Sequence, residues 1–277
     1  MNNSHNRMFD PVSLRKTILE MAFAGSTVHI GCAFSIVELL AVLYRNHLAY
    51  PGNDPLSPER DYLVLSKGHG VMAQYACMYE LGWLQHDVHI QKYFSDGSEL
   101  KGLSDSRVPG LEVTSGSLGH GFSVGVGIAM GLKRRASDRN VFAIVGDGEI
   151  NEGPIWEGML VAAHHKLDNL MIIVDANGFQ AMGRTEDVLH LGNLAAKFES
   201  FDFVVREVDG HNEPEIDSAI RELLADQSGR PKALLATTVK GKGLSFMEHE
   251  NKWHYTRLDA DTFDKAIAEL SAMEPIV

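Results

Sequence analysis

Short runs of apolar, often β-branched residues alternate along the chain with longer segments in which apolar residues recur at helical spacing. The runs predict strands at Tyr62–Leu65, Val141–Val145, Leu170–Asp175, Phe203–Val208 and Ala233–Val239. The longer segments predict helices at Leu14–Ala24, Ser35–Leu48, Val71–Leu81, Gly121–Arg135, Pro154–His164, Glu215–Ala225 and Asp261–Ser271. Continuously apolar strands are typical of a sheet covered on both faces. We therefore predict an α/β fold, with a mainly parallel central sheet and helices on both faces.

One stretch of the chain follows neither pattern. Residues 96–121 show little periodicity and are rich in glycine, at Gly97, Gly102, Gly110, Gly116, Gly119 and Gly121. Ordered loops of this length are often part of a binding site, so we expect this one to lie near a site. No repeat, low-complexity tract or linker divides the sequence, which predicts a single domain over residues 1–277.

The charge balance argues against some classes of partner. The chain contains 25 Lys and Arg against 37 Asp and Glu, a net charge of −12. Such a chain is not generally attracted to nucleic acid or an anionic membrane, and an anionic ligand would need local neutralisation, for example by a metal ion. Two cysteines cannot form a disulfide framework or a thiolate zinc site, and the polar start MNNSHNRMFD lacks an apolar signal region. With no apolar stretch long enough to span a bilayer, we expect a reduced, cytoplasmic protein.

Two predicted strands end in residues that carry side-chain oxygens. Asp147 and Asn177 lie 30 positions apart, a spacing that suits a crossover between neighbouring parallel strands. Their side chains can then converge on one hard cation, while Gly146 and Gly148 allow a phosphate to approach the backbone. By itself Gly-Asp-Gly is also typical of an ordinary tight turn, and Asp175 with Asn177 of an Asx turn. The spacing favours a metal–diphosphate site, with Mg²⁺, Ca²⁺ or Mn²⁺ as the ion.

The segment that carries these residues, GDGEINEG with the later IIVDAN, resembles the thiamine-diphosphate-binding motif and, more closely, the transketolase family. The resemblance implies a thiamine-diphosphate-binding fold. It also implies that Asp147, Asn177 and the backbone carbonyl of Phe179 hold the divalent cation. Gly148 would lie against the diphosphate, and neighbouring Gly146 and Glu149 would also belong to the cofactor site.

Four further segments match the same family in order. GSTVHIGCAFSIVELL resembles its amino-terminal histidine region and implies that His29 faces the substrate channel. SKGHG implies that His69 lies beside the diphosphate, and VPGLEVTSGSLGHG implies that Gly116 and Leu118 touch the aminopyrimidine. KGKGLSFMEHENKWH implies that His254 reaches both cofactor and substrate. The catalytic residues implied by the resemblance are thus His29, His69 and His254.

The acids after the motif have two interpretations. Glu152 and Glu157 are suited to the first turn of a helix, where carboxylates interact favourably with the helix dipole. The resemblance instead implies acids at a subunit interface. Nearby Trp156, Met159 and Leu160 are expected in the core.

The resemblance implies an enzyme that transfers a two-carbon ketol unit from a ketose donor to an aldehyde acceptor. It covers nearly all of this chain but only the amino-terminal part of a full transketolase, so the glutamate supplied by the pyrimidine-binding domain has no counterpart. We therefore expect a separately encoded carboxyl-terminal partner, activity only with that partner, and a heterotetramer with two copies of each chain. Leu103 stands where transketolases usually have a histidine that contacts the sugar, which predicts a non-standard sugar or sugar phosphate.

Two alternatives remain at this stage. The α subunit of a thiamine-dependent 2-oxo acid dehydrogenase shares the metal motif and a two-chain organisation, although SKGHG and PGLEVTSGSLGHG favour transketolase. A non-catalytic, cofactor-binding regulatory subunit is the other alternative. The presence of His69, Asp147 and Asn177 argues against it.

Overall fold

The computed structural model describes residues 8–273. The predicted domain and the polar start extend beyond them, into residues 1–7 and 274–277. The strands are β1 (Tyr62–Leu65), β2 (Val141–Gly146), β3 (Leu170–Ala176), β4 (Phe179–Gln180), β5 (Gly183–Arg184), β6 (Val204–Asp209) and β7 (Lys232–Thr237). The helices are α1 (Pro11–Ala24), α2 (Ile30–Phe34), α3 (Val37–Val42), α4 (Val71–Glu80), α5 (His120–Arg134), α6 (Gly153–His164), α7 (Thr185–Val188), α8 (Leu194–Ser200), α9 (Glu213–Ala225) and α10 (Ala260–Ala272).

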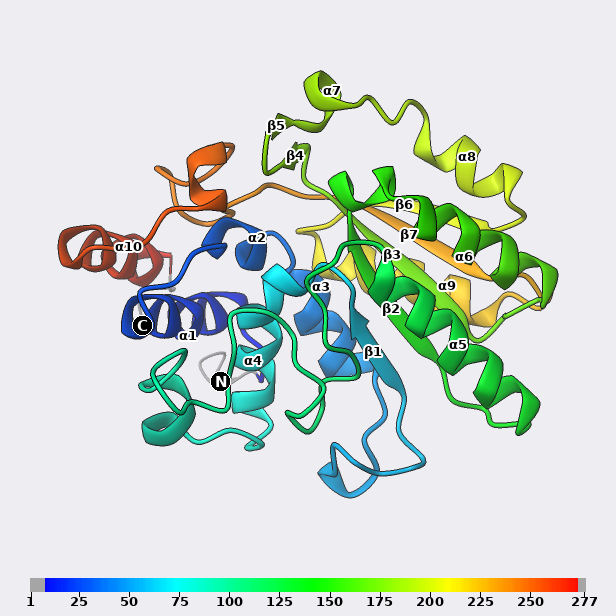
Figure 1. The fold of residues 1–277 in the computed structure, drawn as a ribbon, viewed down its shortest axis with the longest axis horizontal. Helices are drawn as coiled ribbons and strands as arrows, with labels where there is room; N and C mark the ends of the chain where they lie inside the picture. Colours follow the sequence, from blue (N-terminus) through cyan, green and yellow to red (C-terminus); the bar gives the residue numbers. More distant parts are fainter. Residues whose placement is uncertain (1–7, 274–277) are drawn as a thin grey trace, which may run out of the picture.

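A five-stranded parallel sheet in the order β1-β2-β3-β7-β6 forms the centre of the molecule (Figure 1). Each of its strands overlaps one of the five predicted runs, so the prediction of a mainly parallel α/β sheet is confirmed. The short β4 and β5 form a separate antiparallel pair. Because all strands of the main sheet run the same way, their carboxyl ends meet at one edge, and the residues that follow them lie together.

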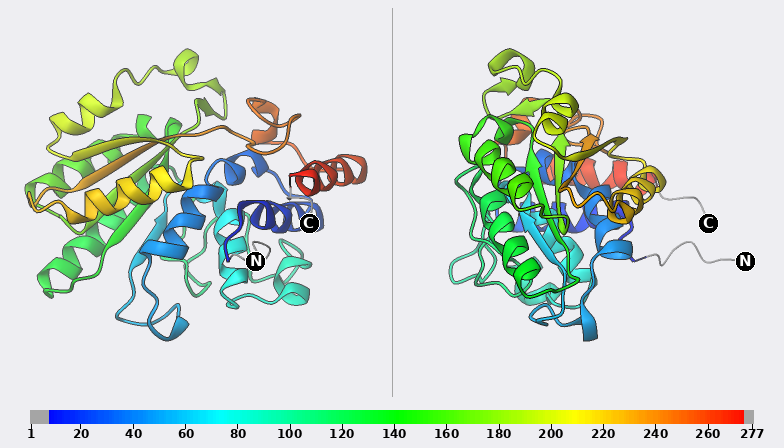
Figure 2. Two further views of the ribbon diagram at one scale, coloured as in Figure 1. Left: turned by 180° about the vertical axis from the view of Figure 1, so that it is seen from behind. Right: turned by 90° about the vertical axis from the view of Figure 1, so that its right-hand side faces the viewer.

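Two helical layers cover the sheet on opposite faces, as the edge-on view of Figure 2 shows. Alternate strand residues divide between two apolar clusters. Leu63, Leu65 and Phe142 pack with α1 to α4 and α9, whereas Val64 and Ala143 pack with α5, α6 and α8. Both clusters are buried, which explains why the strands read as nearly continuous apolar runs.

The predicted helix at Ser35–Leu48 differs from the structure. Ile36 has a non-helical conformation (φ −109°, ψ 9°), so α3 begins only at Val37, and a wider π-helical turn at Leu43–His47 ends the segment. The short α8 was not predicted, since its helical pattern covers less than two turns. Asn193 starts it by accepting a hydrogen bond from the Ala196 N–H at 2.9 Å.

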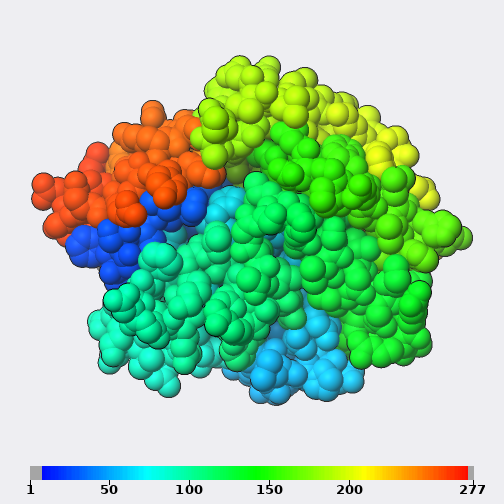
Figure 3. All heavy atoms as spheres, in the orientation of Figure 1, coloured from blue at the N-terminus to red at the C-terminus, as the bar shows by residue number. Residues whose placement is uncertain are grey.

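The loop after α4 contains one π-helical turn at His86–Ile90, and no regular helix or strand is found from Gln91 to Gly119. It covers the lower front of the molecule in the space-filling view (Figure 3). The same view shows the segment before α10 meeting the β4–β5 pair, and the Asn251 side chain donates to the Ala181 carbonyl at 3.2 Å. Among residues 8–273, no helix combines the length and apolar character that crossing a membrane requires.

A buried ion pair joins the helices of one layer and predicts acid sensitivity. The guanidinium of Arg15 donates to both oxygens of Glu38 at 2.7 and 3.0 Å, and His211 Nδ1 lies 2.9 Å from Glu38 Oε2. Burial opposes ionisation, but the Arg15 charge and the His211 hydrogen bond lower the pKa of Glu38 from 4.5 to about 2. This carboxylate therefore stabilises the fold above its unfolded pKa, and the stabilisation is lost as the pH falls from about 4.5 towards 2.

We expect Glu38→Gln to lower the free energy of unfolding at pH 7 by about 3 kcal/mol, in proportion to the pKa shift. The loss should shrink as the pH falls below 4.5, because the native carboxylate is then protonated as well. Urea unfolding at several pH values measures both effects. Glu59→Gln, at an exposed position, is the control. Equal unfolding curves for the two variants would contradict the prediction.

Candidate active site

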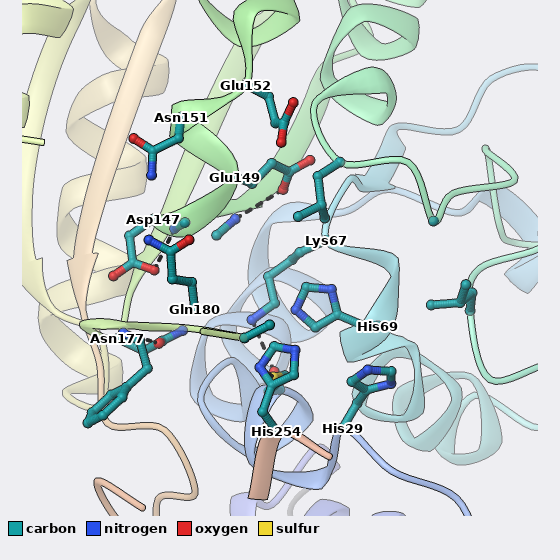
Figure 4. A pocket seen from close by; sticks show the side chains of 18 residues that line it. His29, Lys67, His69, Asp147, Glu149, Asn151, Glu152, Asn177, Gln180 and His254 are labelled. Atoms are coloured by element: carbon teal, nitrogen blue, oxygen red, sulfur yellow. Dashed lines mark hydrogen bonds between the residues drawn. The ribbon is translucent and has the colours of Figure 1, made fainter. Parts of the chain in front are cut away.

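A cavity of about 370 Å³ opens at the carboxyl edge of the sheet (Figure 4). Most of the residues selected from the sequence line it: His29, His69, Leu103, Gly116, Leu118, Gly146, Asp147, Gly148, Glu149, Glu152, Asn177, Phe179 and His254. Glu157 lies outside this lining. The parallel topology thus brings together side chains that are up to 225 positions apart, between His29 and His254.

Asp147 directly follows β2, and only 5% of the residue is exposed. Its Oδ1 accepts a hydrogen bond from the Gly148 N–H at 2.8 Å, and its Oδ2 accepts from the Gly178 N–H at 2.7 Å and the Thr185 hydroxyl at 3.1 Å. Burial, together with the nearby charge of Asp175, raises the pKa of Asp147 to about 6. A cation beside this carboxylate would offset the cost of ionising it, so Asp147 is suited to bind one.

Asn177 directly follows β3, and a buried ion pair orients its amide. Asn177 Nδ2 donates to Asp175 Oδ2 at 2.7 Å, and its Oδ1 accepts from the Phe179 N–H at 3.0 Å. Asp175 pairs with the ammonium group of Lys67, and both side chains are at most 1% exposed. Burial acts against both charges, but their attraction lowers the pKa of Asp175 and raises that of Lys67. The pair engages the amide nitrogen and leaves the oxygen of Asn177 as the group available to a cation.

Glu149 connects three parts of the cavity wall. Its Oε1 accepts from the Ser66 hydroxyl at 2.6 Å and the Gly119 N–H at 2.7 Å, and its Oε2 accepts from the Gly146 N–H at 3.1 Å. Burial raises the pKa of this carboxyl. Since these bonds join the end of β1, the start of α5 and the end of β2, Glu149 holds the wall in place.

The three histidines form a triangle on one side of the cavity, facing the side that carries Asp147 and Asn177 (Figure 4). The ring centroid of His29 lies 5.5 Å from that of His69 and 5.3 Å from that of His254, and the last two are 5.5 Å apart. The His29 N–H also donates to the His254 carbonyl at 3.2 Å. Three separate segments therefore meet at this point.

Buried lysines keep these rings neutral. Burial and the charges of Lys240 and Lys67 lower the pKa of His29 and His69, and that of His254 to about 3. Lys240 is fully buried and donates to His254 Nδ1 at 2.9 Å and to the Asn251 side-chain oxygen at 2.9 Å. A ring that accepts at Nδ1 carries its proton on Nε2. Near pH 7 the triangle thus offers neutral imidazoles, which can both donate and accept hydrogen bonds.

The residues of the cavity fit a diphosphate with a divalent cation. A Cβ on Gly148 would lie 2.6 Å from the Gln180 Cβ, so glycine is needed where the chain turns at the cavity wall. Gln180 Nε2 is buried and has no hydrogen-bond partner within residues 8–273, which leaves a donor that a polar ligand can satisfy. No three His, Cys, Asp or Glu side chains of those residues are grouped to hold a metal ion. A cation would therefore depend on Asp147, amide and main-chain oxygens, and oxygens of the ligand itself.

The two acids proposed for a subunit interface are both exposed at the start of α6. Leu160 was expected in the core, and that prediction is wrong, because the residue is 61% exposed. Its neighbour Val161 is 39% exposed, and Val124 on the adjacent α5 is 45% exposed. The outer face of α5 and α6 therefore presents apolar side chains together with Glu152 and Glu157.

Several residues of the cavity were missed in the sequence, namely Lys67, Lys240, Cys32, Asn151 and Gln180. A signal existed for the two lysines, since each lies within two residues of the end of a predicted strand. The argument that selected Asp147 and Asn177 applies to them equally. Cys32, whose Sγ lies 3.5 Å from His254 Nδ1, has no comparable signal because α2 was not predicted.

Comparison with known families defines the class of the protein. The family model described as transketolase, thiamine diphosphate binding domain, matches residues 14–275. The chain therefore belongs to the transketolase family.

Individual relatives narrow this assignment. One chain of the two-component apulose-4-phosphate transketolase of Actinobacillus succinogenes is 38% identical over 258 residues, which cover 92% of this chain and 92% of that protein. The 6-deoxy-6-sulfo-D-fructose transketolase subunit SqwG of a Clostridium species is 37% identical over 93% of each chain. The transketolase structure from Leishmania mexicana has a TM-score of 0.86 at 28% identity and covers 96% of this chain, which spans 42% of that enzyme.

The chain thus matches separate transketolase subunits over nearly their full length, and less than half of a single-chain enzyme. The prediction of an amino-terminal subunit of a two-component transketolase, a transferase, is confirmed. These matches favour that interpretation over a 2-oxo acid dehydrogenase subunit or a regulatory protein.

Proposed function

We propose that this chain is one diphosphate-binding domain that holds thiamine diphosphate with a divalent cation. With a carboxyl-terminal partner subunit, it transfers a two-carbon ketol unit from a ketose to an aldehyde. The observation that carries the proposal is the convergence of Asp147, Asn177 and three neutral histidines on one cavity. The relatives named for apulose 4-phosphate and 6-deoxy-6-sulfofructose, together with Leu103, support a non-standard sugar as substrate.

In this proposal, the cation is held by Asp147, the amide oxygen of Asn177 and the carbonyl of Phe179. Mg²⁺ suits these oxygens, and Ca²⁺ or Mn²⁺ would be accepted by the same set. His69, His254, Gly116, Leu118 and the Gly146–Glu149 turn surround the cofactor. When bound, thiamine diphosphate supplies the electron sink that lets a carbon–carbon bond break and form.

The histidines move protons around the reacting sugar. A neutral imidazole can accept a proton from a substrate hydroxyl or donate one to an oxygen, and His29, His69 and His254 are placed to do both. Lys67 and Lys240 keep the rings uncharged, so they are ready to accept protons near pH 7. The ring of His254 is further oriented by the hydrogen bond from Lys240.

The outer face of α5 and α6 supports self-association within a heterotetramer. Its exposed Val124, Leu160 and Val161 would be covered by a second copy, and Glu152 and Glu157 would lie at that interface. We propose that this chain alone is inactive, because the partner supplies the rest of the site. A cytoplasmic location is supported by Cys32 and Cys77, both of which are unpaired and buried.

The test is co-purification of this chain with the product of the adjacent open reading frame. The complex is then assayed for ketol transfer with thiamine diphosphate, Mg²⁺ and a panel of sugar phosphates and modified ketoses. We expect a complex with two copies of each chain that is active only when both are present. Activity of this chain alone, or decarboxylation of a 2-oxo acid by the pair, would contradict the proposal.

We expect His254→Ala to reduce turnover of the pair by about 10²- to 10⁴-fold, as for loss of a group that transfers protons. Thiamine diphosphate affinity should change less than about tenfold, since the cation site remains intact. Steady-state kinetics and calorimetry measure the two effects, with His190→Ala, an exposed histidine outside the cavity, as the control. An equal loss in affinity and turnover would indicate that His254 only helps to bind the cofactor.

A further inference from the structure

A second cavity, of about 360 Å³, opens beside the cofactor cavity. It is lined by residues 26–29 before α2, residues 101–103, Phe94, Tyr255 and Arg257. His29 and Leu103 line both cavities, so the two are adjacent across these side chains. A molecule bound beside the histidine triangle could therefore extend past Leu103 into the second cavity.

Two cations of this second cavity have no acidic partner. Arg257 Nε donates to the Ser26 carbonyl at 2.7 Å, and Lys101 Nζ donates to the Ser98 carbonyl at 2.6 Å. No carboxylate of the described residues lies within salt-bridge distance of either group, although the whole chain carries a net charge of −12. The carbonyl bonds hold both heads in place, and the terminal nitrogens of Arg257 make no further hydrogen bond within residues 8–273. Two positioned cations without acids are suited to an anionic ligand.

The remaining wall is apolar and aromatic. Phe94, Tyr255 and Leu103 are 52%, 70% and 38% exposed, which leaves their carbon surfaces open to a ligand. The Tyr255 ring packs edge-on against the His29 ring at 5.9 Å and so links this wall to the triangle. Such surfaces suit the C–H faces of a sugar.

Three lining residues have left-handed backbone conformations, which cost energy for residues other than glycine. These are Ser26 (φ 46°), His29 (φ 70°) and Phe94 (φ 57°). Strained conformations of this kind concentrate at ligand sites, where the surrounding structure maintains them. The backbone therefore gives an observation that is independent of charge.

We propose that the second cavity receives the far end of the sugar substrate, and that Lys101 and Arg257 bind a tetrahedral anionic group there, a phosphate or a sulfonate. The proposal rests on the proposed function, because the sugar enters from the cofactor cavity. It assigns part of substrate selection to this chain, and it gives Leu103 a role as the apolar boundary between the two cavities.

The test compares three ketoses that share one carbon skeleton: fructose 6-phosphate, 6-deoxy-6-sulfofructose and fructose. The reconstituted pair is assayed with a neutral acceptor, glycolaldehyde. In the variant Lys101→Gln/Arg257→Gln, we expect KM for a charged donor to rise about 10- to 100-fold with little change in kcat, as for lost charge-assisted hydrogen bonds. The values for fructose should not change. Whichever charged donor shows the effect distinguishes phosphate from sulfonate.

The control variant Lys92→Gln/Arg135→Gln removes the same two charges at exposed positions outside the cavity. Equal KM ratios between charged and neutral donors in all variants would overturn the proposal. Absence of ketol transfer with every ketose of the wider panel would instead contradict the proposed function. In that case calorimetric titration of inorganic phosphate into the cofactor-saturated pair decides, and phosphate binding that is absent, or unchanged by Lys101→Gln/Arg257→Gln, overturns the second-cavity proposal.

Discussion

Replacing Asp147 by asparagine should weaken thiamine diphosphate binding in the presence of Mg²⁺ by at least about 100-fold. Loss of an outer hydrogen-bond partner at a metal site costs about 10- to 100-fold in affinity, and loss of the only proposed carboxylate ligand should cost more. Asparagine keeps an oxygen that can accept hydrogen bonds from Gly178 and Thr185, so the surrounding turn should be retained. Calorimetric titration of the cofactor, with and without Mg²⁺, measures the effect.

The same variant should not be less stable than the native chain when metal and cofactor are absent. Because burial raises the pKa of Asp147 to about 6, its ionised form opposes folding at higher pH, and this penalty increases as the pH rises from about 4 through 6. Asp147→Asn removes it, so urea unfolding at pH 8 should show equal or greater stability. Thr185→Ala, which removes one of the donors to Asp147, is a neighbouring control that keeps the carboxylate. Unchanged cofactor binding in Asp147→Asn would show that the cation lies elsewhere.

Replacing Lys67 by methionine should lower the free energy of unfolding by about 3–5 kcal/mol, because it leaves the buried Asp175 carboxylate without its counter-charge. Asp175 would retain hydrogen bonds from Ser35 and Thr238, but these do not replace a full charge. Denaturant unfolding at pH 7 measures the loss. Lys133→Met, which breaks a surface pair with Asp168, should cost less than about 1 kcal/mol.

The double variant Lys67→Met/Asp175→Asn separates charge from packing. It removes both charges and keeps an amide that can interact with Ser35, Thr238 and Asn177, so it should recover at least about 2 kcal/mol of the single-variant loss. Cofactor affinity should remain reduced, because an amide orients Asn177 less strongly than a carboxylate does. A double variant as unstable as Lys67→Met would show that the loss comes from packing of the lysine stem.

The amino-acid sequence by itself determined the sheet and the edge at which the site lies. Continuous apolar runs are encoded locally, since each buried strand needs apolar side chains on both faces, and all five runs form the parallel sheet. A parallel sheet then brings its strand ends together, so Asp147 and Asn177 line one cavity as their spacing predicted. The similarity of the motif segments to transketolases was also present in the sequence, and comparison with known proteins confirmed the family.

Only the tertiary structure decided which distant charges pair and which surfaces stay open. Lys67 and Asp175 are 108 positions apart, and no local pattern indicates that one neutralises the other. Helical spacing suggested that Leu160 is buried, but the outer face of α6 has no element of this chain against it. The second cavity depends on three loops whose left-handed residues leave no periodic trace in the sequence. Periodicity records whether a side chain is buried within its own element, whereas pairing, exposure and cavity shape arise from how separate elements pack.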